Sequence, residues 1–149
     1  MKYLVLSLAA LVIPSLSYPS CYRMPYLSRP AHPLDAGEIP IFNVASFGVN
    51  VDEEPQGNQY YIPPGQHISV AGAQEADIKF NEETEVSYVS GNDGTFNYVI
   101  NPIGENPQLC IHVSPNGCGS LNWCPGDPPT PPVTCNDGTE LYVTLYPPQ

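Results

Sequence analysis

Residues Thr95–Pro115 read TFNYVINPIGENPQLCIHVSP, and this stretch sets the expected fold of the chain. Phe96–Ile100 is dense in aromatic and β-branched residues, a composition that predicts a strand. Asn101–Gln108 is a polar connector that contains two prolines and one glycine. Leu109–Val113 is a second β-forming run, and it leads into a cysteine-rich tail. Two short strands joined by turn-forming residues indicate a β protein.

The rest of the body repeats this pattern of short runs and turn signals at intervals of roughly 10 residues. Ala76–Phe80 alternates, so that Ala76, Ile78 and Phe80 are expected to point inward. Further strands are expected at Ile39–Val51 (as a pair, or as one strand with a break), Gln59–Ile62, Gln66–Ala71, Glu82–Val89 and Glu140–Tyr146. Loops are expected at Asp52–Asn58 and Cys118–Cys135, and hairpin turns at Gly91–Gly94 and Asn136–Gly138.

Proline content narrows the fold class. The 19 prolines disfavour long helices and confine strands to short runs. No segment shows the apolar period of a helix three turns long. We therefore expect an all-β fold, a β-sandwich of about eight to ten short antiparallel strands stabilised by disulfides.

The N-terminus has the composition of a secretory signal peptide at residues 1–17. Lys2 supplies a positive charge, Tyr3–Ile13 is an apolar core, and small serines precede the expected cleavage before Tyr18. The apolar run is shorter than the about 20 residues that a membrane-spanning helix needs. We therefore expect a secreted, extracellular protein with an N-terminal arm at residues 18–38 and one β-sandwich domain at residues 39–149.

The mature chain is expected to be strongly acidic. Cleavage before Tyr18 would leave 3 basic and 15 acidic residues, a net charge of −12 with the histidines neutral. Such a surface repels nucleic acids and anionic membranes, so neither is expected as a partner. A monomer is expected.

The cysteines predict a disulfide-bonded protein. There are five of them, all after the expected cleavage site: Cys21, Cys110, Cys118, Cys124 and Cys135. In an extracellular protein the simplest arrangement is two disulfides and one spare thiol. Proximity favours a bridge from Cys135 to Cys118 or to Cys124, which would hold the loop between them. Cys21 and Cys110 would then form the second bridge and attach the arm to the body.

Five pieces of the chain occur in an order and spacing that match a known family. They are Ile39–Val51 as IxIFN…FxVxV, YIPPGQHI at Tyr61–Ile68, EVSYV at Glu85–Val89, FNYVINPIGENPQL at Phe96–Leu109, and the tail CGSLNWC…PPVTCNDGTELYVTLYP. Over about residues 39–146 the chain therefore resembles the fungal thaumatin-like secreted proteins of the Blastomyces yeast-phase-specific type. The resemblance implies a thaumatin-like β-sandwich.

The sequence departs from this family at one disulfide. The family joins a cysteine near the end of the first strand to one at the end of the chain, and Ala45 and Tyr146 stand near those places here. A bridge between Cys21 and Cys110 would replace the missing one. The acidic cleft of the larger plant thaumatin-like proteins cannot be aligned with this chain, so its glucan-binding role is not carried over.

Paired carboxylates are the one catalytic arrangement that the sequence offers. Glu83 and Glu85 would share a strand face, as would Glu75 and Asp77. Glycoside hydrolysis needs two carboxyl groups roughly 5–10 Å apart, with the pKa of one of them raised by burial. With 15 acidic residues, same-face pairs are expected by chance, so we expect no catalytic site and no enzyme activity.

Metal and cofactor motifs are weak. The run Asp52–Glu54, with Asn50 or Asn58, offers oxygen ligands for calcium but lacks the spacing of an EF-hand. The histidines show no zinc spacing, and no nucleotide- or phosphate-binding motif occurs. We expect neither a metal nor a cofactor.

Trp123 has two interpretations. It lies between Cys118 and Cys124, and it is either a stacking platform for a sugar ring or partner residue, or a side chain packed over a disulfide. Together with Glu83 and Glu85 it forms the possible binding surface.

These features leave two hypotheses for the function. The first is a secreted non-enzymatic protein, an effector candidate if the source is a fungus that colonises a host, with an unknown host protein as its target. The second is a carbohydrate-binding or weakly glucan-hydrolysing protein with a cell-wall polysaccharide as its partner, and it rests on fold analogy alone.

Overall fold

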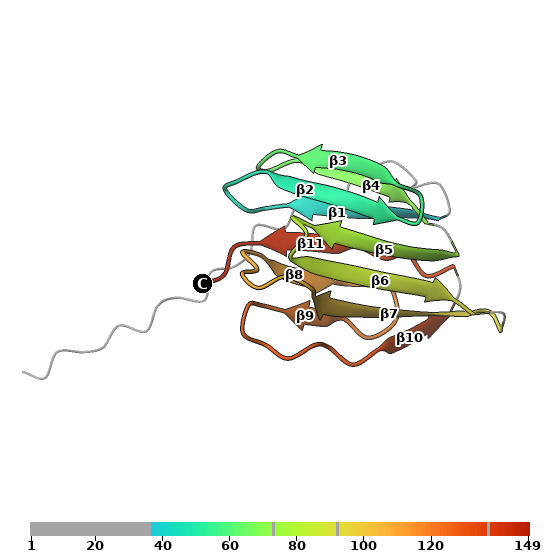
Figure 1. Cartoon of the computed structure of the whole chain (residues 1–149). Coiled ribbons are helices and arrows are strands. Elements are labelled where there is room, and N and C mark those ends of the chain that lie inside the picture. The colour runs from blue at the N-terminus through green and yellow to red at the C-terminus, as the bar shows by residue number, and fades with distance from the viewer. Residues whose placement is uncertain (1–36, 73, 92, 137) are drawn as a thin grey trace, which may run out of the picture. The chain divides into compact units, whose positions relative to one another are not determined.

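The computed structural model describes residues 37–149 except residues 73, 92 and 137. The described chain forms eleven strands in two sheets, and none of it is helical. Figure 1 shows the two sheets stacked as layers, with β5 and β6 in front of β11 and β8. The all-β fold is therefore confirmed. The expected signal peptide and arm lie outside the described residues, apart from Gly37 and Glu38.

Sheet A contains five strands in the spatial order β4, β1, β11, β8, β9. Their bounds are His67–Ala71 for β4, Glu38–Asn43 for β1, Val143–Tyr146 for β11, Cys110–Val113 for β8 and Leu121–Trp123 for β9. β1 and β11 run parallel, with Ile41 opposite Val143, and the other neighbours are antiparallel. The first and last strands that the structure describes thus lie side by side inside sheet A.

Sheet B contains six strands in the spatial order β10, β7, β6, β5, β2, β3, and all neighbours are antiparallel. Their bounds are Val133–Asn136 for β10, Thr95–Pro102 for β7, Thr84–Ser90 for β6, Glu75–Phe80 for β5, Val49–Glu54 for β2 and Asn58–Ile62 for β3. This sheet carries most of the acidic side chains described below.

The core fills the space between the sheets with alternate residues of both. Successive side chains of a strand point to opposite faces, so one face of each strand can be buried while the other meets solvent. Ala76, Ile78 and Phe80 of β5 are fully buried, which confirms the expected inward face. Residues 95–115, from which we inferred the β fold, cross between the layers, because β7 belongs to sheet B and β8 to sheet A. Both strands expected within it are confirmed.

Three expectations about strand order were wrong. The expected segment Ile39–Val51 does form two strands, β1 and β2, but they do not pair, since residues 44–48 carry the chain from sheet A to sheet B. The hairpin expected at Asn136–Gly138 does not form, because β10, which ends at Asn136, belongs to sheet B and β11 belongs to sheet A. The expected loop Cys118–Cys135 contains β9 and β10, which raises the count to eleven strands. Runs of three or four residues among prolines and glycines are too short for alternation to reveal them.

The disulfides are Cys118–Cys135 and Cys110–Cys124. The first confirms one of the two expected partners of Cys135. The second contradicts a bridge between Cys21 and Cys110, and Cys21 itself lies outside the described residues. The physical reason is the pairing of β8 with β9. Because Ile111 is opposite Trp123, the preceding Cys110 lies across from Cys124, with 4.1 Å between their Cα atoms.

The described part of the chain was also searched for membrane spans. No helix there has the length and apolar character to cross a membrane.

Candidate functional site

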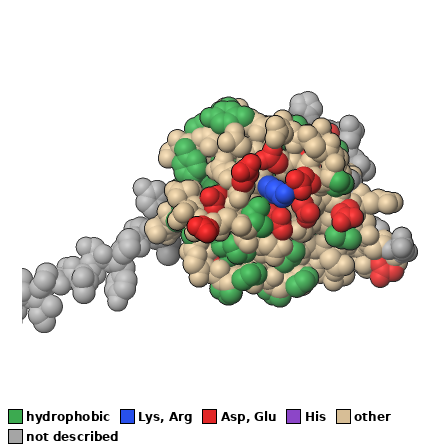
Figure 2. Space-filling view, viewed as in Figure 1, with side chains coloured by type: hydrophobic (Ala, Val, Ile, Leu, Met, Phe, Trp, Pro, Cys, Tyr) green, Lys and Arg blue, Asp and Glu red, His purple; other side chains and the backbone are tan. Residues whose placement is uncertain are grey.

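The outer face of sheet B gathers polar and charged side chains into rows. One row runs across five strands because the register places these residues opposite one another: Gln59, Asp52, Lys79, Glu85 and Asn101. The neighbouring row contains Glu54 and Asp77. Figure 2 shows the result as a cluster of acidic side chains around one basic side chain. We call this surface the acidic face.

Lys79 lies at the centre of the acidic face. Its Nζ lies 2.7 Å from Glu54 Oε2, an ion pair with both side chains partly exposed. The pKa of Lys79 is raised, mainly by the hydrogen bond to Glu54; desolvation opposes this, and the charges of Glu54, Glu85 and Asp77 raise the pKa further. No other lysine or arginine occurs among residues 37–149, so the carboxylates of this face share a single cationic side chain there.

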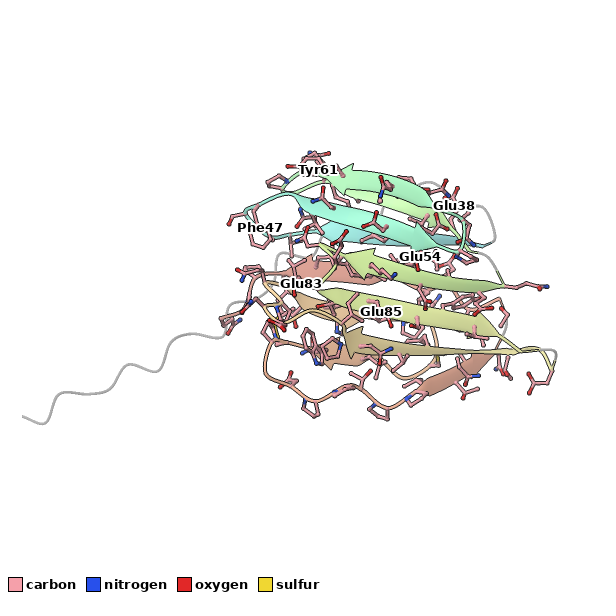
Figure 3. The ribbon with its side chains drawn as sticks, in the orientation of Figure 1. Glu38, Phe47, Glu54, Tyr61, Glu83 and Glu85 are labelled. Carbon is pink, nitrogen blue, oxygen red and sulfur yellow. A yellow bond between two sulfur atoms is a disulfide. The ribbon has the colours of Figure 1, made fainter. Side chains whose placement is uncertain are left out.

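Glu83 and Glu85 lie near each other but act as structural acceptors (Figure 3). Glu85 Oε1 accepts hydrogen bonds from Ser87 Oγ at 3.3 Å and Asn101 Nδ2 at 3.2 Å. Glu83 is in the turn before β6, and its Oε2 accepts from the backbone N–H of Asn106 at 3.1 Å. Both carboxylates are partly exposed, and each is already bonded to the strand or loop beside it.

Two adjoining hollows lie along β2 and β3. One, of about 330 Å³, is lined by Asp52, Glu53, Glu54, Gly57, Asn58, Gln59, Lys79, Glu82 and Ile103. The other, of about 430 Å³, is lined by Asn50, Asp52, Gln59, Tyr60, Asn81 and Glu82. They share Asp52, Gln59 and Glu82. Carboxylate and amide groups dominate both hollows, so they offer hydrogen bonds and negative charge to a ligand.

The turn between β5 and β6 projects Glu82 into both hollows. Asn81 and Glu82 have φ angles of 51° and 57°, in the left-handed region that glycine and asparagine tolerate best. Asn81 also caps β2, because its Oδ1 accepts from the N–H of Asn50 at 2.9 Å. Glu82 therefore occupies a backbone conformation that costs a glutamate free energy.

Glu53 points the opposite way from its two acidic neighbours. It is fully buried, and its Oε2 accepts hydrogen bonds from Asn58 Nδ2 at 3.0 Å and Tyr60 OH at 3.2 Å. Burial of Tyr60 raises the pKa of its hydroxyl, and the charge of Glu53 and their hydrogen bond raise it further. The three acids of Asp52–Glu54 therefore do not converge, and the described residues include no cluster of three metal-ligating side chains.

Trp123 is not part of this surface. Its side chain is 1% exposed, and its Nε1 donates to the carbonyl of Asp127 at 3.0 Å. The hypothesis of a stacking platform is therefore wrong, because the ring has no free face. The sequence suggested it because Trp123 was expected in a loop, whereas β9 turns it into the core.

A further hollow, of about 210 Å³, opens between the sheets near Glu38, the other end of the sandwich from Tyr61 in Figure 3. Tyr88 and Phe96 line it, with their ring centroids 5.0 Å apart. It is smaller than the roughly 300–1,000 Å³ of most ligand sites, and we do not take it as the functional site.

One exposed aromatic residue was not singled out from the sequence. Tyr61 of β3 is 60% exposed, and its ring lies against Gly48, where a Cβ atom would overlap the tyrosine hydroxyl. Because successive side chains of a strand point to opposite faces, the sequence of β3 shows only that Tyr60 and Tyr61 face opposite ways. The glycine beside it was a signal, since a missing side chain leaves room for a ring to lie on the backbone.

Comparisons with known proteins show the fold. No protein-family model and no curated protein matches the chain. Among solved structures, the protein elicitor MoHrip2 from Magnaporthe oryzae is similar, with a TM-score of 0.63 and 20% identity over 74% of this chain and 98% of that one. The thaumatin-like xylanase inhibitor TLXI is also similar, with a TM-score of 0.55 and 16% identity over 72% of this chain and 97% of that one. The protein thus has a thaumatin-like β-sandwich fold, as expected.

Proposed function

We propose that this protein is a secreted, non-enzymatic binding protein that acts outside the cell on a partner protein. In a fungus that colonises a host, it would be an effector-like protein with a host target. The observation that carries the proposal is the state of the carboxylates on sheet B. Glu83 and Glu85 are bound to neighbouring groups on an open surface, whereas a glycosidase needs a buried acid facing a second carboxylate across a substrate cleft.

Three further features support action outside the cell. The N-terminus has the composition of a signal peptide. The β-sandwich contains two disulfides, which persist mainly in oxidising environments such as the extracellular space. The resemblance to the fungal Blastomyces-type proteins, which stays a prediction, points the same way. The two similar structures are described as a protein elicitor and a xylanase inhibitor, and neither description names a catalytic activity.

The second candidate is binding of β-glucan. The two hollows favour it, because planar carboxylate and amide groups such as Asp52 and Gln59 hydrogen-bond well to sugar hydroxyls. In that case the partner would be a cell-wall polysaccharide.

One experiment separates these functions. The purified mature protein is incubated with insoluble β-glucan and, separately, with laminarin. We expect neither retention on the glucan nor release of reducing sugar. Retention that is lost in Asp52→Ala and Gln59→Ala, but kept in Val89→Ala, would establish the second candidate. Laminarin turnover that disappears in Glu83→Gln or Glu85→Gln would establish an enzyme.

A further inference from the structure

One end of the sandwich exposes apolar side chains from two loops and a strand. We call this surface the apolar end, and it consists of Val44, Phe47, Tyr61, Pro63 and Pro64. Tyr61 is 60% exposed and Val44 39% exposed, both prolines are exposed, and Phe47 is half-buried against the core. Figure 3 shows Phe47 and Tyr61 near each other at this end. Exposed apolar groups gathered in one place often mark an interaction surface.

A buried asparagine locks the two loops together. Asn43 is 1% exposed, and its Nδ2 donates to the carbonyls of Phe47 at 2.8 Å, Ile62 at 3.0 Å and Pro63 at 3.3 Å. Its Oδ1 accepts from the N–H of Ala45 at 3.0 Å. The loop that carries Phe47 and the turn that carries Pro63 therefore hold one arrangement without a partner. Such preorganisation lowers the entropy that binding costs.

The ring of Tyr61 lies against the loop that carries Phe47. A Cβ atom at Gly48 would lie 1.9 Å from the Tyr61 hydroxyl, so the ring covers this glycine closely. The ring remains largely exposed because its other face points away from the backbone. A tyrosine that packs against the backbone on one side and is open on the other is the kind of anchor that dominates the energy of protein interfaces.

The acidic face borders this apolar end. Tyr61 is opposite Asn50 in the register of β2 and β3, and the next outward pair is Asp52 and Gln59. Asn50 and Asp52 line a hollow together with Glu82. A partner that covers Tyr61 would therefore meet negative charge beside it.

We propose that the apolar end is the docking surface for a partner protein that presents an aromatic or aliphatic side chain flanked by lysine or arginine. The apolar side chain would pack on Tyr61 and Phe47, and the basic residues would meet Asp52 and Glu82. Charge complementarity selects this occupant, because an acidic or neutral partner would leave these carboxylates desolvated without a counter-charge. The proposal rests on the proposed function and adds to it the surface and the chemistry of the partner.

The test uses a displayed random peptide library as the probe. The disulfide-bonded mature protein is immobilised, and bound peptides are sequenced and synthesised for affinity measurements. We expect the selected peptides to combine lysine or arginine with an aromatic or aliphatic residue. Tyr61→Ala should weaken their binding at least about tenfold, as loss of a central anchor does. Tyr61→Phe should keep most of it.

Further variants test the specificity of the apolar contact, the contribution of the Asp52 charge and the integrity of the fold. Val89→Ala removes another exposed apolar side chain, 46% exposed on β6, and should leave binding unchanged. Asp52→Asn should weaken binding a few fold at about 0.1 M salt and little at about 1 M, where the Debye length falls from about 10 to 3 Å. Unchanged thermal unfolding of Tyr61→Ala would show that the fold is intact.

Several results would overturn this docking surface. They are the absence of any selected peptide, a selection without basic residues, or binding that is insensitive to both Tyr61→Ala and Phe47→Ala. These failures differ from failure of the proposed function, which the glucan and laminarin assays detect in wild-type protein without any peptide.

Discussion

At the scale of single residues, buried polar side chains determine how the ends of strands are joined. Asn43 is the last residue of β1, and its amide replaces bonds that the two adjoining loops cannot make to each other. Four backbone groups, three carbonyls and one N–H, bond to it, and two of these bonds, to the Ile62 carbonyl and from the Ala45 N–H, are buried, where a lost partner is costly. Nothing in the sequence distinguishes this asparagine from those in turns.

Asn43→Ala should lower the free energy of unfolding by about 3 kcal/mol, because buried carbonyl and N–H groups lose their partner. Urea denaturation followed by fluorescence measures this. Asn116→Ala, at an exposed position, is the control and should change stability by less than about 0.5 kcal/mol. Equal stability of Asn43→Ala and wild type would show that the loops do not depend on this side chain.

Tyr98 makes stability depend on pH in the alkaline range. It is 1% exposed, its hydroxyl donates to the Gly119 carbonyl, and burial raises its pKa above the ordinary value of 10.0. Above about pH 10 an unfolded tyrosine loses its proton while the folded one keeps it. The folded state then binds more protons than the unfolded state, so the free energy of unfolding falls as pH rises.

We therefore expect wild-type protein to lose stability between about pH 9 and pH 11, measured by urea denaturation at each pH. Tyr98→Phe should be about 1 kcal/mol less stable at neutral pH, since one hydrogen bond is lost, and its alkaline decline should be shallower. A decline as steep as that of wild type would assign the effect to other groups.

At the scale of elements, alternation predicted the long strands and their inner faces, as β5 shows. It missed β9 and β10, which are too short to show a period. The backbone conformation of the turn between β5 and β6 could not be predicted either, because a glutamate at position 82 does not indicate a positive φ. Gly94, in the turn between β6 and β7, is an ordinary glycine with a φ of 78°.

Glu82→Gly should raise the free energy of unfolding by about 1 kcal/mol, because glycine adopts this conformation without strain. Chemical denaturation gives the value. Glu83→Gly, the neighbouring control, should instead lower stability, since it removes the acceptor of the Asn106 N–H. A destabilised Glu82→Gly variant would mean that the Glu82 side chain makes favourable contacts that outweigh the strain.

At the scale of the whole molecule, the two disulfides connect different parts of the fold. Cys110–Cys124 joins neighbouring strands of one sheet, which are already paired by the backbone. Cys118–Cys135 joins the segment before β9 of sheet A to β10 of sheet B. The second bridge therefore ties the two layers together at a place where the connecting chain is rich in proline.

Replacing Cys118 and Cys135 together by alanine should lower the free energy of unfolding by about 3 kcal/mol on the chain-entropy account, for a loop of 17 residues. Peptide mapping without reduction should recover both bridges from wild-type protein and only Cys110–Cys124 from this variant. A wild-type peptide that links Cys21 to Cys110 would contradict the pairing described here.

The sequence by itself determined the class of this protein. Residue composition and period-two alternation show that strands form and which side of each is buried, because these depend on neighbours along the chain. Partners across space depend instead on how two layers pack and close, which no local pattern records. Only the tertiary structure therefore placed β1 beside β11, paired Cys110 with Cys124, buried Trp123, and brought Tyr61 and Phe47 together at one end of the sandwich, next to the acidic face that contains Asp52.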